Sequence, residues 1–282
     1  MFSIHGNHDD PSGDGNLCAL DILSVSGLIN YFGKQNEVDN ISIKPILLKK
    51  GTSRLALYGL GNIRDERLNR TFRNKKVEMF KPTEFEDEWF NLMVLHQNRA
   101  AHSSHNFISE DYLDNFLHLV LWGHEHECLI RPQQKSEETF FVTQPGSSVA
   151  TSLCEGESRD KYVGILEVTG HQFSINEIRL KTVRPFIMQE VELKLVEDLD
   201  PTDQTAVSSF LQQKIKEMIA DAKAQWRNNN ASADESDFPK PLIRLKVYSF
   251  TQSRLNILVD LQRSTRSDLV SNTLIRLPTQ RR

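Results

Sequence analysis

Four side chains in this sequence could together bind metal ions. His124 and His126 are one residue apart and follow the apolar run 117–122. Asn7 lies in a Gly-Asn-His-Asp stretch, and His96 follows another apolar run. Imidazole nitrogens bind Zn²⁺, Mn²⁺ and Fe²⁺, whereas an amide oxygen suits the harder of these ions. One amide oxygen and three ring nitrogens suit a hydrolytic centre whose two metal ions lie roughly 3.5–4 Å apart across a phosphate.

Each of these pieces has a simpler explanation when it is taken alone. Asn-His-Asp between glycines is common turn chemistry, and a histidine at a strand end can be satisfied by the backbone. Their shared context favours the metal site, because the apolar runs 2–4, 92–95 and 117–122 each predict a buried strand directly before one piece. Loops that follow parallel strands meet at the carboxyl edge of a sheet, where ligands bind. We therefore expect these four residues to meet in space.

Five stretches, taken in order, resemble one family. They are Ser-Ile-His-Gly-Asn-His-Asp-Asp-Pro, Leu-Tyr-Gly-Leu-Gly, His-Gln-Asn-Arg, Trp-Gly-His-Glu-His-Glu-Cys and Gln-Pro-Gly-Ser-Ser, at 3–11, 57–61, 96–99, 122–128 and 144–148. Together they are similar to the eukaryotic double-strand-break repair and meiotic recombination nuclease. That nuclease is the counterpart of bacterial SbcD within the calcineurin-like metallophosphoesterases. The resemblance extends from residue 2 to about residue 247.

The resemblance implies a role for each candidate residue. Asn7, His96 and His124 would bind one metal ion, and His126 would bind the other. His8 resembles the catalytic histidine near the leaving oxygen, where an imidazole that titrates near neutral pH can act as general acid or stabilise the transition state. The implied cofactor is Mn²⁺, with two ions in the complete parent and at most one weak site here. The implied activity is DNA cleavage, as single-strand endonuclease and 3′-to-5′ exonuclease.

Two motifs of the family do not occur in this sequence. Members carry an Asp-x-His and then a Gly-Asp-x-x-His ahead of the Gly-Asn-His-Asp, and here only six residues precede Asn7. The missing groups include the aspartate that bridges the two ions and the histidine that supports His8. We therefore expect an amino-truncated chain. Its complete parent would be a nuclease, and the chain alone would be inactive.

Composition narrows the class of protein. The chain has 282 residues, 38% of them hydrophobic and 26% charged, and contains no apolar run near the roughly 20 residues that span a bilayer. We expect no membrane partner.

The formal net charge of −4 argues against a nucleic-acid surface over the whole chain, so DNA would contact local patches, whose residues stay unknown at this stage. Cys18, Cys128 and Cys154 have no zinc spacing and suggest reduced thiols. The family implies a nuclear location.

Alternating strand and helix patterns predict a layered α/β fold. The resemblance implies that this fold is an incomplete metallophosphoesterase sandwich, followed by a smaller α+β capping domain. We expect residues 1–182 to form the nuclease domain without its first strands, and residues 183–282 to form the DNA-binding cap. The pattern predicts helices at 17–25, 65–75 and 202–226, and strands at 54–60, 89–95, 117–122, 186–195 and 241–248. Segments 140–143, 163–168 and 173–178 suggest an antiparallel continuation, with a hairpin turn at 169–171. After residue 247 the family pattern is lost, so a misjoined end is expected there.

The resemblance also implies partners: DNA, a coiled-coil ABC ATPase and, in the complete parent, a second copy of the chain. Leu17, Leu20 and Leu23 form an apolar stripe on the helix predicted at 17–25, which resembles one helix of the family's dimer bundle. The stripe could instead pack on its own sheet. Two other functions stay open. The chain could be a different metallophosphoesterase, or a non-catalytic fragment that binds DNA or partners.

Overall fold

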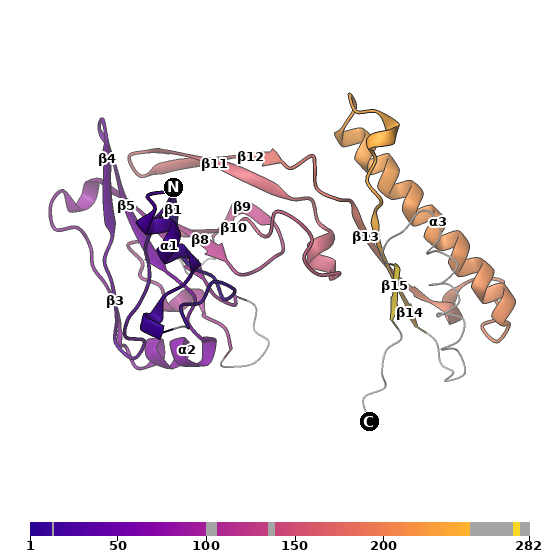
Figure 1. The fold of residues 1–282 in the computed structure, drawn as a ribbon, viewed down its shortest axis with the longest axis horizontal. Coiled ribbons are helices and arrows are strands. Elements are labelled where there is room, and N and C mark those ends of the chain that lie inside the picture. Colours follow the sequence, from indigo (N-terminus) through magenta and orange to yellow (C-terminus); the bar gives the residue numbers. More distant parts are fainter. Residues whose placement is uncertain (13, 100–105, 135–138, 249–272, 277–282) are drawn as a thin grey trace. The chain divides into compact units, whose positions relative to one another are not determined.

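The computed structural model describes residues 1–12, 14–99, 106–134, 139–248 and 273–276. It divides the chain into two units (Figure 1). The first comprises Met1–Ser147 with Tyr162–Arg179, and the second comprises Ser148–Lys161 with Leu180–Arg282. The predicted boundary after residue 182 lies close to Arg179, where the chain leaves the first unit for the second time. The grouping of Ser148–Lys161 with the second unit was not apparent from the sequence.

A six-stranded sheet organises the first unit (Figure 1). Its order is β4 (Ile46–Lys50), β5 (Ser53–Leu60), β7 (Trp89–His96), β8 (Leu119–Gly123), β10 (Phe141–Gln144) and β9 (Leu129–Gln133). The four central strands are mutually parallel, whereas β4 and β9 are antiparallel to their neighbours at the two edges. The strands predicted at 54–60, 89–95 and 117–122 are therefore present. Their carboxyl ends point to the same edge of the sheet.

The predicted direction of one segment was wrong. We expected 140–143 to continue antiparallel together with 163–168 and 173–178. Instead β10 pairs in parallel with β8, with Phe141 opposite Leu119. Only β11 (Tyr162–Thr169) and β12 (Gln172–Arg179) form the expected antiparallel hairpin, which turns at Gly170 with φ of 59°. β10 can run parallel to β8 because β9, at the edge of the sheet, first brings the chain back in the opposite direction. A four-residue apolar run does not predict the direction of a strand.

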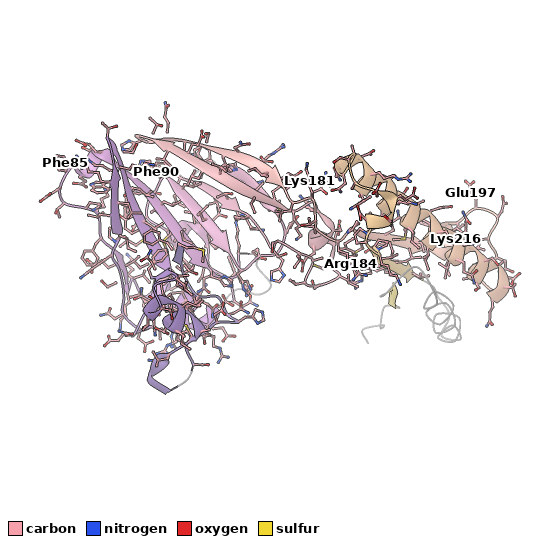
Figure 2. All side chains as sticks on the ribbon, turned by 45° about the horizontal axis from the view of Figure 1, so that its top comes forward. Phe85, Phe90, Lys181, Arg184, Glu197 and Lys216 are labelled. Carbon is pink, nitrogen blue, oxygen red and sulfur yellow. The ribbon has the colours of Figure 1, made fainter. Side chains whose placement is uncertain are left out.

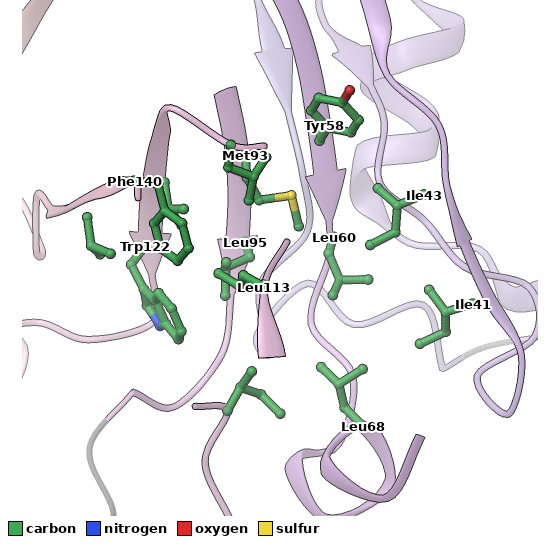
Figure 3. Packing of buried hydrophobic residues seen from close by; sticks show 14 of the residues in the cluster. Ile41, Ile43, Tyr58, Leu60, Leu68, Met93, Leu95, Leu113, Trp122 and Phe140 are labelled. Atoms are coloured by element: carbon green, nitrogen blue, oxygen red, sulfur yellow. The ribbon is translucent and has the colours of Figure 1, made fainter. Parts of the chain in front are cut away.

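Alternating side chains of the sheet build two hydrophobic clusters, one on each face. On the first face Tyr58, Leu60, Met93 and Trp122 are buried with residues of α2 (Asp65–Arg73) and β3 (Ile41–Ile43), which pairs with β6 (Val77–Met79) (Figure 3). On the second face the cluster contains Leu57, Phe90, Leu92 and Leu119 and is covered by Phe32 and by side chains of the β11–β12 hairpin. The sheet is thus buried on both sides, as expected for parallel strands.

The amino-terminal elements are less well covered. β1 (Phe2–Ser3) pairs in parallel with β2 (Asn30–Tyr31) in a sheet of two strands. Between them α1 (Ala19–Val25) has no buried residue, and Ile22 and Val25 are 70% and 91% exposed. Of the predicted stripe, Leu17 and Leu23 are 60% and 37% exposed and Leu20 is partly buried, so the stripe is only partly covered by its own unit.

The second unit is a βαβ arrangement with a third strand. β13 (Phe186–Glu192), β14 (Leu242–Tyr248) and β15 (Thr273–Arg276) are parallel, and α3 (Gln204–Asn229) connects the first two. Asp203 caps α3 by accepting hydrogen bonds from the backbone N–H groups of Thr205 and Ala206. One face of α3 packs its buried residues on β14, while Lys216 is on the exposed face (Figure 2). The cap contains both helix and strands, and β13 and β14 are parallel strands joined through α3.

The remaining elements are single 3₁₀ turns. They are η1 (Asp14–Asn16), η2 (Glu86–Glu88), η3 (Glu110–Tyr112), η4 (Glu155–Ser158), η5 (Leu193–Leu195) and η6 (Glu235–Asp237). In the part of the chain that the structure describes, no helix combines the length and the apolar character needed to cross a bilayer. Most of the end predicted to be misjoined lies outside the described residues, apart from β15.

A histidine at the amino end of β8 is held in its neutral form. The backbone N–H of Asn91 donates to Nδ1 of His118 at 2.9 Å, so this nitrogen carries no proton. The His118 ring is stacked on Phe90 and also lies against His171, at a centroid distance of 4.6 Å. Burial, and then the proximity of His171, lowers the pKa of His118 to about 4.

This arrangement predicts a pH-dependent stability. Unfolded histidine has a pKa of about 6.5, so between about pH 6.5 and pH 4 the unfolded chain binds more protons than the folded chain. The contribution of His118 to the free energy of unfolding is therefore complete above this window and is lost as the pH falls through it. Denaturant unfolding at pH 7 and pH 5 should show a smaller pH dependence in His118→Gln, which cannot titrate. An equal pH dependence in the variant and the parent would contradict the assignment. His126→Gln, at an exposed histidine near the opposite, carboxyl edge of the sheet, serves as the control.

Candidate metal centre

The candidate residues follow three strands of the first unit. Asn7 comes soon after β1, His96 is the last residue of β7, and His124 directly follows β8. β7 and β8 are parallel neighbours with His96 opposite Gly123. The strand register therefore brings the second and third of these side chains together at the carboxyl edge of the sheet, as the sequence predicts.

Three donor atoms converge there. His96 Nε2 lies 3.0 Å from the side-chain oxygen of Asn7, and His124 Nδ1 lies 3.3 Å from the same oxygen. The two ring nitrogens are 3.4 Å apart, and the rings are nearly perpendicular, with an interplanar angle of 77°. Two imidazole nitrogens and an amide oxygen thus face one point from three segments of the chain.

The electrostatics favour neutral imidazole at this point. Burial, and then the nearby histidines His124, His5, His126 and His8 in that order, lowers the pKa of His96 to about 4. At pH 7 the His96 ring is uncharged, and one of its nitrogens has a lone pair. This is the protonation state that a metal ligand needs.

His126 and His8 lie beside this group. Both are exposed, and both are close enough to affect the pKa of His96. His126 lines a pocket of about 450 Å³ together with His96 and His124. Among the described residues, no set of three or more His, Cys, Asp or Glu side chains is arranged to hold a metal ion. The convergent group is different, since it contains two histidines and an amide.

Two glycines make room for the His96 ring. A β-carbon on Gly6 would lie 2.8 Å from Cε1 of His96, and one on Gly123 would lie 3.0 Å from its Nδ1. The first distance is too short for a real β-carbon contact, so a side chain at Gly6 would displace the ring, and the second is tight enough that a side chain at Gly123 would push the ring by a few tenths of an ångström. The glycines that flank the motifs therefore have a steric role here.

The loop that carries Asn7 is anchored by a buried histidine. His5 is hydrogen-bonded through Nε2 to the carbonyl oxygen of Asn62 at 3.0 Å and through Nδ1 to the hydroxyl of Tyr31 at 2.8 Å. Gly61 lies directly against this ring, because a β-carbon there would be 2.1 Å from it. No role for His5 followed from the sequence, although it lies inside the stretch that carries the family resemblance.

Sequence reasoning also missed Arg99 and Gln144. Arg99 donates to Gln144 and to the buried Glu110, and Gln144 donates to the backbone carbonyl of Glu127. Both residues belong to stretches quoted for the family resemblance, so their position in the motifs was the available signal. The three cysteines are free, in agreement with the expected thiols, and Cys18 is a hydrogen-bond donor to Tyr31.

Comparison with known proteins identifies two domains. The family of calcineurin-like phosphoesterases matches residues 1–128, and the family described as the Mre11 DNA-binding presumed domain matches residues 173–261. The chain is 51% identical over 255 residues to the double-strand break repair protein mus-23 of Neurospora crassa. It is 49% identical over 251 residues to the double-strand break repair protein MRE11 of Homo sapiens and 47% identical over 256 residues to that of Arabidopsis thaliana.

These alignments cover most of this chain but a minor part of its relatives. Each includes 88% of the present chain, compared with 34% of the Neurospora crassa protein and 35% of the human and Arabidopsis thaliana proteins. The chain therefore spans about a third of the length of the curated relatives that it matches.

The steric role of Gly6 can be tested directly. Gly6→Ala should displace the His96 ring and separate its Nε2 from the Asn7 oxygen, because the added methyl group would otherwise overlap the ring. Long-range ¹H–¹⁵N spectra of the histidine rings should then show altered His96 signals. Gly170→Ala is the control for a strained glycine replacement elsewhere in the unit: its φ of 59° disfavours alanine, but a β-carbon there meets nothing within 4 Å, so the His96 signals should stay unchanged. Unchanged His96 signals in folded Gly6→Ala would show that Gly6 does not set the ring position.

Proposed function

This chain belongs to the Mre11 family of double-strand break repair proteins, and from that premise we propose that it is part of a Mn²⁺-dependent DNA nuclease. The activity would be that of a single-strand endonuclease and 3′-to-5′ exonuclease in a nuclear repair complex. The observation that carries the proposal is the convergence of Asn7, His96 and His124 on one point at the carboxyl edge of the sheet.

The donor set fits a divalent metal ion. Asn7 Oδ1, His96 Nε2 and His124 Nδ1 would hold one ion, and His126 would contribute to a second. Neutral imidazole and an amide oxygen suit Mn²⁺. When bound, the metal would supply positive charge that stabilises the negative charge developing on the phosphate. The chain contributes the orientation of these ligands, through the register of β7 and β8 and the space left by Gly6 and Gly123.

His8 is the proposed proton donor. It follows Asn7 directly in the chain and is exposed, so its ring is accessible to a substrate. A protonated imidazole at this position can donate a proton to the leaving oxygen of the phosphodiester as the bond to phosphorus breaks. Asn7 and His8 would thus bring a metal ligand and an acid to the same phosphate.

The second unit is proposed to contact DNA. Its match to the Mre11 DNA-binding domain supports this role. On β14, Arg244 and Lys246 lie on the face opposite the residues that pack on α3. Lys246 is paired with Glu190, so the face is not uniformly basic. This pairing agrees with the net charge of −4, which argues for local rather than general attraction to DNA.

Partners of the complete protein are proposed from the family. We propose a coiled-coil ABC ATPase as the catalytic partner and self-association through α1 in the complete parent. The exposure of Ile22 and Val25 supports the second point, since an uncovered apolar helix face favours a protein contact. The chain contains neither the Asp-x-His nor the Gly-Asp-x-x-His motif. We propose that these 282 residues alone do not cleave DNA.

Two alternatives differ in their substrate. A different metallophosphoesterase would hydrolyse phosphoproteins or small phosphodiesters, and a non-catalytic fragment would bind DNA without cutting it. Rates measured on duplex DNA and on a chromogenic diester, with a chain extended by the two missing motifs, separate the nuclease from the first alternative. The absence of cleavage by the extended chain would favour the second.

Metal binding by the present chain is predicted to be weak. With three donors converging but no bridging aspartate in the sequence, calorimetry should detect at most about one Mn²⁺ per chain. His124→Ala should abolish this binding, because it removes one of the three convergent donors. His171→Ala, at an exposed histidine of the same unit, should leave it unchanged. Two tightly bound ions would mean that other side chains replace the missing ligands.

Catalysis by the extended chain should depend on His8. His8→Asn is expected to lower the rate of DNA cleavage by about 10²–10⁴-fold, the usual contribution of a general acid or base. Binding of Mn²⁺ and of DNA should be nearly unchanged, since His8 is not among the convergent donors. Cleavage at the parent rate would exclude a catalytic role for this residue.

A further inference from the structure

The backbone of the segment from His124 to Glu127 has an unfavourable conformation, which contacts with other segments must stabilise. His124 has φ of 81°, in the left-handed region that a residue with a β-carbon rarely occupies. Such conformations cost free energy and persist where surrounding contacts impose them. The segment carries two of the proposed metal ligands, so the contacts that impose its shape also set the position of those ligands.

Arg99 supplies several of these contacts. Its Nε donates to the carboxylate of Glu110 at 2.8 Å, and its Nη1 donates to the side-chain oxygen of Gln144 at 3.0 Å. Its backbone N–H donates to the carboxylate of Glu125 at 2.7 Å. The Glu110 side chain is only 4% exposed and that of Arg99 17%, so their ion pair is largely shielded from water. Arg99 thereby links the loop after β7 directly to Glu125, between the two histidines.

Gln144 extends this link to the other side of His126. The Gln144 amide accepts from Arg99 and donates through Nε2 to the backbone carbonyl of Glu127 at 3.0 Å. Because a guanidinium can only donate, it determines which end of the Gln144 amide faces it and therefore which end faces Glu127. Gln144 is the last residue of β10 and is buried.

The two residues after Pro145 complete the support. The backbone N–H of Ser147 donates to the carbonyl of His126 at 3.1 Å. Gly146 has φ of 73° and lies against the same backbone, since a β-carbon there would be 2.7 Å from the His126 carbonyl oxygen. Three consecutive residues, from Glu125 to Glu127, are therefore held by the loops that follow β7 and β10.

We infer that Arg99 and Gln144 are positioning residues for the metal ligands His124 and His126. Arg99 binds Glu125 after β8 through its backbone N–H and Gln144 at the end of β10 through its guanidinium, and Gln144 in turn binds Glu127. Glu125 and Glu127 are each adjacent in sequence to a proposed ligand. A role limited to core stability would not require contacts on both sides of His126. Partners that orient metal ligands typically affect metal affinity by about 10–100-fold. The inference rests on the proposed function, because it takes these histidines to be ligands.

Two conservative variants separate positioning from folding. Arg99→Lys keeps the charge beside Glu110 but lacks the rigid fork that also reaches Gln144. Gln144→Glu keeps an acceptor for Arg99 and loses the donor to the Glu127 carbonyl, so it leaves the Arg99–Glu110 pair intact. Arg131→Lys is the matched control, because Arg131 pairs with Glu177 at an exposed position of the same unit. If Arg99→Lys fails to fold, Gln144→Glu decides the question.

The measurements are histidine-ring spectra without metal and calorimetry with Mn²⁺, with thermal unfolding to verify the fold. In both variants we expect altered His124 and His126 signals, unchanged His118 signals and an affinity for Mn²⁺ lower by about 10–100-fold. Folded variants with parent-like His124 and His126 spectra would overturn the inference. If the parent chain binds no Mn²⁺, the proposed metal site is contradicted, and the metal-free spectra still decide whether Arg99 and Gln144 position the two histidines.

Discussion

Strands β7 and β8 run parallel with His96 opposite Gly123, and the candidate metal centre depends on this register. The glycine leaves space for the His96 ring, and the residue after it is His124, whose Nδ1 then lies 3.4 Å from His96 Nε2. A slip of one residue would turn alternate side chains to the opposite face. Both hydrophobic clusters would be lost with it, because Leu95 and Trp122 are buried on one face while Leu92 and Leu119 are buried on the other. Core packing and ligand placement therefore constrain the same register.

The contacts that support the proposed ligands lie at the same edge of the sheet. Loops after β7, β8 and β10 leave neighbouring strands, so a single arginine can reach all three. Its charge is matched by the buried Glu110, which limits the cost of removing both ions from water. The proposed metal ligands are thus held through hydrogen bonds to their neighbours in sequence, at the ends of strands that the hydrophobic core makes rigid. The left-handed backbone at His124 is tolerated in that setting.

The second unit makes its own core from α3 and its parallel strands, in keeping with its separate match to the Mre11 DNA-binding domain. Ser148–Lys161 belongs with this unit, although it lies between strands of the first. Within that segment Glu157 is buried. Its carboxylate accepts hydrogen bonds from Thr151 and Ser152 and lies 3.6 Å from Lys161. A buried carboxylate whose oxygens accept several hydrogen bonds is not left unsatisfied, so this cluster holds the segment in a defined shape.

The sequence by itself determined the donor types, their strand-end positions and most of the elements that carry them. These depend on local patterns, since an apolar run followed by Gly-His-x-His predicts both a buried strand and the loop after it. Only the tertiary structure decided how distant segments meet. It made β10 parallel to β8, left α1 without buried residues and joined Arg99 to Gln144 across the sheet edge. Those features arise from pairing between residues far apart in the chain, and no local pattern of hydrophobicity or propensity specifies a partner at such a separation.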